Sequence, residues 1–162
     1  MRSERINFLA ATTATAGLVG FIGVFADWFR VTYAAAGGLV TMDIYGVEDA
    51  TGAIAVAAAL GALLFGCAYI LLRDADIRRL TVWLMAICSV ALFVAAILGF
   101  ARVDDVLGAN PFLPGADGAT TYQAGVAVGL AISFLCGLIA TVATVLLISR
   151  RERGTEEAAA AA

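Results

Sequence analysis

The sequence contains no histidine and no lysine, and only 14% of its residues are charged. Without histidine, the chain lacks the usual protein ligand of haem and of most zinc and copper sites, and it lacks histidine-based acid–base catalysis. About a quarter of the residues in a soluble domain are charged, whereas 62% of this chain is hydrophobic. The composition therefore predicts a membrane protein.

Cysteines and catalytic motifs are also scarce. The three cysteines, Cys67, Cys88 and Cys136, each lie in an apolar run, where cysteine usually acts as a small hydrophobic residue. The sequence shows no CxxC pair, phosphate-binding loop or nucleophile elbow. No charged side chain interrupts the middle of an apolar run, although ion pumps and proton relays need such groups. We therefore expect neither an enzyme nor an autonomous ion-coupled transporter, and no cofactor or metal.

Four uncharged runs are each long enough to cross a bilayer, which takes about 20 apolar residues. The predicted spans are residues 6–26, 50–72, 80–101 and 123–148. The first run follows charged residues, as in a signal peptide, but its length favours an uncleaved helix. The spans predict an all-α membrane protein, with a four-helix transmembrane bundle in a single domain at residues 1–149.

The remaining segments connect the spans or end the chain. Residues 27–49 and 102–122 form two long hydrophilic connections. The second connection holds both prolines and several glycines, which predicts an irregular loop. Residues 150–162 are of low complexity and are expected to form a disordered tail.

The placement of arginine predicts the orientation, because cytoplasmic loops of membrane proteins carry an excess of positive charge. Arg30 and Arg102 lie in the long connections, whereas the other eight of the ten arginines lie near the termini or in the short turn at residues 73–79. We therefore expect a multi-pass protein of a bacterial plasma membrane, with both termini in the cytoplasm and both long connections outside.

Acidic residues gather in the two outer connections. They are Asp43, Glu48 and Asp49 in the first connection and Asp104, Asp105 and Asp117 in the second. A calcium site needs several converging oxygen ligands, and the spacing here matches no calcium-binding loop. Solvated loop charge is the preferred interpretation, and a cation site is the alternative.

Small residues recur at every fourth position of the last apolar run. They are Gly125, Gly129, Ser133, Gly137 and Thr141. This spacing lays a strip without bulk along one helix, where another backbone can approach closely. A chain rich in glycine and alanine also produces such patterns by chance. The preferred interpretation is helix packing within the bundle, and contact with another subunit is the alternative.

The first outer connection contains two segments that alternate polar and apolar residues and are rich in β-branched and aromatic side chains, which favours strands. Pairing Tyr33 with Val40 places Arg30 opposite Asp43 on a polar face. The same register pairs Thr32 with Thr41, Val31 with Met42, Phe29 with Ile44 and Trp28 with Tyr45. The sequence therefore predicts a small extracellular β-hairpin, with an irregular loop as the alternative.

The predicted hairpin has an apolar face. It is made by Phe29, Val31, Tyr33, Val40, Met42 and Ile44. A two-stranded hairpin is marginally stable in water, and an exposed apolar patch usually marks a contact site. We therefore expect this face and the hairpin tip to bind a partner subunit, including by strand addition along an exposed edge.

Four spans, Trp28 just past the first of them and a strand-like first outer connection resemble claudin-like tetraspan proteins. The cysteine pair of the claudin outer loop is absent, which departs from a junction-forming pattern. An all-arginine basic set with abundant alanine, glycine and valine is typical of a high-GC, actinobacterial-type genome. The layout is similar to that of uncharacterised actinobacterial four-helix membrane proteins.

A membrane scaffold without reactive or ion-handling groups favours a non-catalytic accessory or assembly subunit of a larger cell-envelope complex, of respiratory or lipid-transport type. Such a subunit would dock through the outer hairpin and the small-residue helix faces. The expected partners are other membrane subunits and the lipid bilayer, and no nucleic acid. The alternative is a small homo-oligomeric channel or a carrier of lipids or small molecules.

Overall fold

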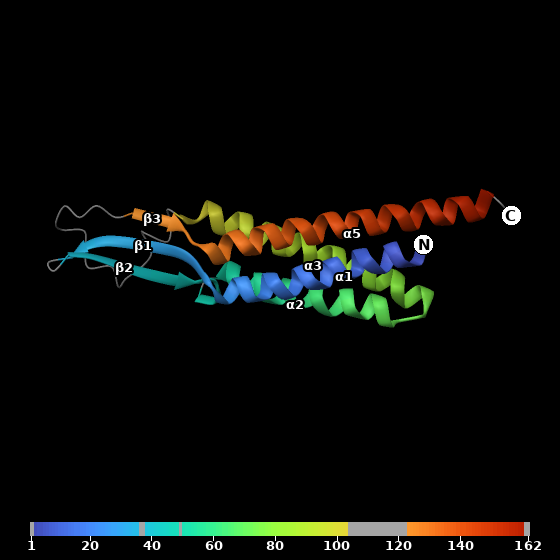
Figure 1. Ribbon diagram of the computed structural model, residues 1–162, viewed down its shortest axis with the longest axis horizontal. Helices are drawn as coiled ribbons and strands as arrows, with labels where there is room; N and C mark the ends of the chain where they lie inside the picture. Colours follow the sequence, from blue (N-terminus) through green and yellow to red (C-terminus); the bar gives the residue numbers. More distant parts are fainter. Residues whose placement is uncertain (1, 36–37, 49, 104–122, 161–162) are drawn as a thin grey trace.

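The computed structural model describes residues 2–35, 38–48, 50–103 and 123–160. It is an elongated helical bundle with a small sheet at one end, and both chain termini lie at the other end (Figure 1). The long helices are α1 (Arg2–Phe25), α2 (Ala50–Leu71), α3 (Ala75–Ala101) and α5 (Val128–Ala160). Within the described part of the chain, these four helices are long and apolar enough to cross a membrane. The prediction of four apolar helices is thereby confirmed.

The helices pack as a closed ring. α1 contacts α2 and α5, and α3 contacts the same two helices from the opposite side. Glycine allows this close approach: a Cβ added at Gly17 of α1 would lie 2.6 Å from the Leu63 backbone nitrogen in α2. In lipid there is little hydrophobic drive between helices, so such close approach of two backbones is a main source of packing energy there. Met85, Leu92 and Leu147 fill the fully buried interior.

A charged turn joins α2 to α3. Asp74 caps α3, and its carboxylate accepts hydrogen bonds from the backbone N–H groups of Asp76 (2.9 Å) and Ile77 (3.2 Å). This pattern satisfies donors that the first helical turn leaves unpaired. The helix therefore begins at Ala75, earlier than the predicted span, because a good N-cap residue precedes the charged residues.

The sheet has three antiparallel strands in the order β2-β1-β3. They are β1 (Asp27–Ala35), β2 (Gly38–Tyr45) and β3 (Gln123–Val126). A short 3-10 helix, η1 (Gly46–Glu48), leads from β2 to α2. The predicted hairpin is therefore confirmed, but it forms part of a larger sheet.

The hairpin register agrees with the prediction over most of its length. Tyr33 pairs with Val40, and Arg30 pairs with Asp43. At the base of the hairpin the prediction was wrong. Asp27, rather than Trp28, pairs with Tyr45, because a register irregularity between Asp27 and Phe29 leaves Trp28 out of the ladder. Such a bulge rotates one side chain out of the regular alternation.

β3 was not predicted, because residues 123–126 were assigned to the fourth span. The structure pairs them with the free side of β1, and α5 begins at Val128. The glycine at position 125 weakens a helix, whereas pairing with β1 gives the backbone groups ladder partners. At the other end, α5 continues through Ala160, where a disordered tail was expected. Alanine has the highest helix propensity of all residues, which favours this continuation.

Candidate functional site

Trp28 joins the sheet to the bundle. Its side chain is fully buried, and its indole Nε1 donates a 3.2 Å hydrogen bond to the Gly23 carbonyl at the end of α1. A Cβ added at Gly46 would lie 2.5 Å from the indole, and one at Gly99 would lie 3.2 Å from it. Glycines on η1 and α3 therefore make the space that the indole fills. The sheet is anchored on the bundle by this contact.

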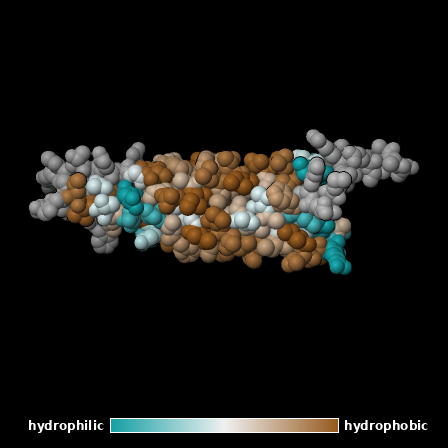
Figure 2. Space-filling view, viewed as in Figure 1, coloured by the Kyte–Doolittle hydropathy of each residue, from teal (hydrophilic) through white to brown (hydrophobic). Residues whose placement is uncertain are grey.

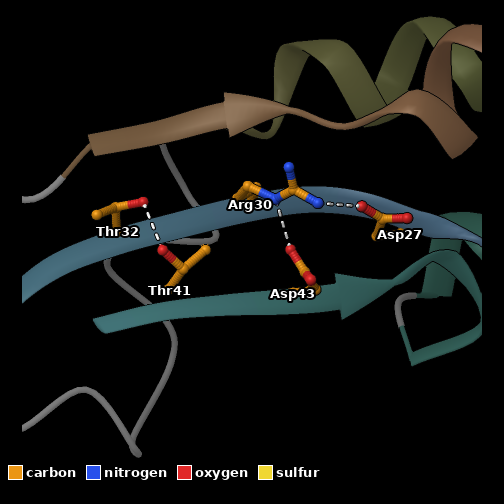
Figure 3. A network of polar contacts seen from close by, with 5 residues as sticks. All are labelled: Asp27, Arg30, Thr32, Thr41 and Asp43. Atoms are coloured by element: carbon orange, nitrogen blue, oxygen red, sulfur yellow. Dashed lines mark hydrogen bonds and ion pairs between the residues drawn. The ribbon is translucent and has the colours of Figure 1, made fainter. Parts of the chain in front are cut away.

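The outward polar face of the hairpin carries an ion-pair network (Figure 3). Arg30 Nε donates to Asp43 Oδ1 at 2.7 Å, and its Nη2 donates to Asp27 Oδ2 at 3.1 Å. The hydrogen bond that Arg30 donates to Asp43, followed by the charges of Asp43 and Asp27, raises the pKa of Arg30. Thr32 and Thr41 contact each other across the strands at 3.4 Å. These cross-strand pairs fix the register, because a slip by one residue would separate every one of them.

The opposite face, which the sequence analysis assigned to partner binding, divides into two parts. Phe29 and Val31 on β1 are buried to 1% exposure, and Ile44 is partly buried against the core. Val40 and Met42 on β2 remain 40% and 37% exposed. Phe29 and Val31 are therefore core residues and not part of an exposed contact face, and Phe29 packs in one cluster with Val24 of α1 and Leu130 of α5. The side chain of Tyr33 lies outside the described residues.

An exposed strand edge adjoins this surface. The strand order makes β2 an outer strand, and no strand in the described part of the chain pairs with its free side. We define the β2 edge as this free side together with the exposed side chains of Val40 and Met42. Because β3 occupies the free side of β1, strand addition to the hairpin is left to the β2 edge.

The predicted small-residue strip of the fourth span packs inside the bundle. A Cβ at Gly129 would lie 2.6 Å from the Gly23 carbonyl oxygen of α1, and one at Gly137 would lie 2.7 Å from Phe93 Cα of α3. Ser133 is fully buried and Thr141 is half-buried. These contacts agree with the interpretation as packing within the chain.

Gly125 departs from this strip. It lies in β3, where the one atom of the described residues within reach of an added Cβ is the Arg30 carbonyl oxygen at 4.0 Å. Its inclusion in a helix-packing strip was wrong, because α5 begins after it.

The sequence analysis missed a cluster of buried hydroxyl groups. Thr144 of α5 lies 3.3 Å from the Thr13 hydroxyl of α1 and 3.5 Å from the Ser89 hydroxyl of α3. All three residues are buried, and each also donates to a carbonyl one turn earlier in its own helix. The spacing of single hydroxyls in apolar runs gave no signal that they would converge. Because each hydroxyl has a single proton to share between these acceptors, the cluster is a buried polar contact among three helices.

The acidic residues form no recognisable metal site where the structure describes them. Among the described residues no group of three or more cysteine, aspartate or glutamate side chains could hold a metal ion. Asp43 is engaged by Arg30. The remaining predicted candidates include Asp49, Asp104, Asp105 and Asp117, which lie outside the described residues.

No protein-family model matches the chain, and no curated protein matches it.

Proposed function

We propose that this protein is a non-catalytic accessory or assembly subunit of a larger cell-envelope complex, embedded in a bacterial plasma membrane. Its partner docks on the β2 edge. The exposed edge strand, held rigidly on an apolar bundle, is the observation that carries the proposal. Three arguments support it: the surface of the bundle, the distribution of arginine and the state of the β2 edge.

The surface of the bundle favours a lipid environment. Apolar residues cover its middle, and hydrophilic residues gather toward its ends (Figure 2). Each helix exposes large apolar side chains, for example Ile22 (62%), Leu64 (63%), Ile87 (64%) and Leu135 (54%). A continuous apolar surface of this kind is costly in water and stable in hydrocarbon.

The charges support one orientation in that membrane. The sheet end carries Arg30 and Arg102, and the Arg30 guanidinium is paired with two aspartates. The opposite end carries Arg73, Arg78, Arg79, Arg150 and Arg151. By the positive-inside rule, the sheet lies outside the cell and both termini lie in the cytoplasm.

The β2 edge supports docking of an extended segment. β2 spans eight residues, and its described side chains lie at the surface or only partly below it. Unpaired backbone groups beside apolar side chains are the features that an added strand uses, since hydrogen bonds give affinity and side-chain contacts give specificity. Trp28 fixes the sheet, so the edge is presented without a large ordering cost.

Affinity purification in mild detergent tests this proposal. We expect the wild-type chain to bring down a larger envelope subunit, and a Val40→Asp/Met42→Asp variant to lose it while the bundle stays inserted. Leu39→Asp is the matched control, because Leu39 is 78% exposed and lies on the other face of the same strand. Recovery of only copies of this chain, in a defined oligomer, would instead favour the homo-oligomeric channel or carrier.

A further inference from the structure

The arginine-rich end of the bundle contains a pocket of about 330 Å³ between the starts of α1 and α3 and the end of α2 and α5. Asn7, Tyr69, Arg73, Arg78 and Arg151 line it together with two apolar residues. We refer to it as the arginine pocket. It lies at the opposite end of the bundle from the sheet, and so it is separate from the β2 edge.

Two of its arginines are held in place by contacts with other helices. The Arg78 guanidinium carbon lies 4.3 Å from the centre of the Tyr69 ring, and Tyr69 itself is buried. Arg151 Nη2 donates a 3.1 Å hydrogen bond to the Ala75 carbonyl in the first turn of α3. A cation over an aromatic face and a fixed hydrogen bond both restrict side-chain motion. The pocket is therefore ordered before anything binds.

Each of these guanidinium groups also has a buried nitrogen without an acceptor. Arg78 Nε and Arg151 Nη1 are shielded from solvent and make no hydrogen bond within the described structure. A buried donor without a partner is costly, and a charged one is more costly than a neutral one. Native proteins rarely leave such groups unpaired, and both arginines line the pocket, so the pocket is the place where a ligand could supply further acceptors to these guanidinium groups.

The charges around the pocket define the chemistry of that acceptor. Among the residues whose side chains the structure describes, three arginines and no acidic residue line the arginine pocket. The neighbouring pocket differs, because Asp76 and Glu152 line it together with arginines. The nearby Asp74 carboxylate is occupied in capping α3. An oxyanion with several acceptor oxygens matches paired guanidinium donors, and phosphate, like carboxylate, is a group that the arginine fork binds through two hydrogen bonds.

We propose that the arginine pocket binds the phosphate group of an anionic phospholipid. The position of the pocket favours a lipid, because Ile6 at the start of the apolar part of α1 lines it, and the exposed side chains of Phe8 and Leu71 lie nearby in sequence on α1 and α2. A phosphate in the pocket would leave the acyl chains against the apolar surface. Basic pockets between membrane helices on the cytoplasmic side hold anionic headgroups by the same physics. The proposal shares the membrane location with the proposed function but needs no partner subunit.

Thermal unfolding of the full chain in a neutral detergent tests the proposal, with tryptophan fluorescence as the readout. We expect phosphatidylglycerol to raise the melting temperature, since a ligand that binds the folded state stabilises it by mass action. Phosphatidylcholine, which has no net charge, should have a much smaller effect. Equal stabilisation by the two lipids would overturn the proposal.

Inorganic phosphate tests whether the ligand is a soluble phosphate instead of a lipid headgroup. If inorganic phosphate stabilises the chain as strongly as phosphatidylglycerol and competes with it, the ligand is soluble phosphate and the lipid assignment is wrong.

Two variants locate the site. Arg78→Gln and Arg151→Gln should each weaken the apparent affinity for phosphatidylglycerol about tenfold, as expected for the loss of one charge-assisted hydrogen bond. Arg150→Gln removes the same charge from the neighbouring, exposed position of α5 outside the pocket, and should change the affinity by no more than about twofold. Equal affinities of all three variants for phosphatidylglycerol would overturn the proposal.

If a variant does not fold, the preference of the wild-type chain for phosphatidylglycerol over phosphatidylcholine decides the question alone. Loss of lipid binding with partner capture unchanged would separate this site from the docking function.

Discussion

The two ends of the bundle treat arginine in opposite ways. At the sheet end, the Arg30 guanidinium is exposed and makes ion pairs with Asp27 and Asp43. At the other end, Arg78 and Arg151 each bury a nitrogen that makes no hydrogen bond in the described structure. A paired surface charge completes local structure, whereas a buried donor without an acceptor needs something from outside the chain. The comparison indicates that the charge of Arg30 is satisfied within the sheet, whereas Arg78 and Arg151 lie where we propose that a ligand binds.

The largest expected difference between the two ends is access from outside the cell. In a background without native cysteines, Thr41→Cys on β2 should react with a membrane-impermeant thiol reagent on intact cells. Asp76→Cys, in the first turn of α3, should react only after permeabilisation, because it lies at the arginine-rich end. Both positions are exposed in the structure, so neither depends on unfolding. Labelling of position 76 on intact cells would reverse the orientation.

Trp28 is expected to make the largest contribution of any single side chain to stability. Trp28→Ala should lower the free energy of unfolding by about 3–5 kcal/mol, because it leaves a cavity between η1 and α3 and removes the bond to Gly23. Trp83→Ala is the control, since Trp83 is 53% exposed near the arginine end. Equilibrium unfolding in mixed micelles measures both variants. Similar losses for the two tryptophans would contradict the role of Trp28 as an anchor.

These two regions also differ in how far the sequence predicted them. The hairpin register was predictable because the alternation of side chains and the Arg30–Asp43 pair allow one alignment of the strands. The burial of Trp28 was not, because it depends on a bulge and on glycines from η1 and α3, far apart in the sequence. β3 was missed for a related reason: a short uncharged segment before a helix carries no strand signal of its own.

The arginine pocket was missed for a different reason. The charges in residues 73–79 and those after residue 149 served as a topology signal, and each segment alone has the appearance of a solvated cluster. Arg151 reaches Ala75 only because α5 packs beside α3, and Arg78 is fixed only because Tyr69 of α2 lies beneath it. Periodicity predicts that helices form, but the pairing of their ends follows from packing between helices.

Glycines in the bundle should tolerate bulk less than their neighbours. Gly129→Leu and Gly137→Leu should lower the free energy of unfolding by at least about 1–3 kcal/mol, because the added atoms meet the backbones of α1 and α3. Val128→Leu, at a position 61% exposed, should have little effect. Detergent gel filtration and thermal unfolding measure the outcome. If all three variants were tolerated equally, these contacts would not hold the bundle together.

The buried hydroxyl cluster should contribute less than the glycine contacts. Thr144→Val keeps the shape of the side chain and removes its contacts with Thr13 and Ser89. We expect a loss of about 0.6 kcal/mol and at most about 1.7 kcal/mol, which are the average and the maximum from double-mutant cycles on polar contacts between membrane helices. Thr141→Val is the control, because the Thr141 hydroxyl donates only to Gly137 within its own helix in the described structure. A loss at Thr141 as large as that at Thr144 would show that the contact between helices adds nothing.

The smallest effect on stability is expected at the exposed ion pair, although it is the most visible polar contact of the sheet (Figure 3). The Arg30 side chain is 56% exposed, and ion pairs at exposed positions are weakened by water and by salt. Asp43 and Asp27 raise the pKa of Arg30 above its ordinary value. Any stability linked to its charge is therefore fully present at neutral pH and is lost only as the pH rises through the higher pKa of the folded state. Arg30→Gln should therefore leave the melting temperature nearly unchanged. The effect of the substitution on the melting temperature should not vary with pH between about pH 6 and 9.

A comparison of the single variants Arg30→Gln and Arg78→Gln sharpens the contrast between the two ends. Only Arg78→Gln should lose the stabilisation by phosphatidylglycerol. If Arg30→Gln lost that stabilisation as well, lipid charge would act on the whole surface, and the two ends of the molecule would not differ in the way the paired and unpaired guanidinium groups indicate.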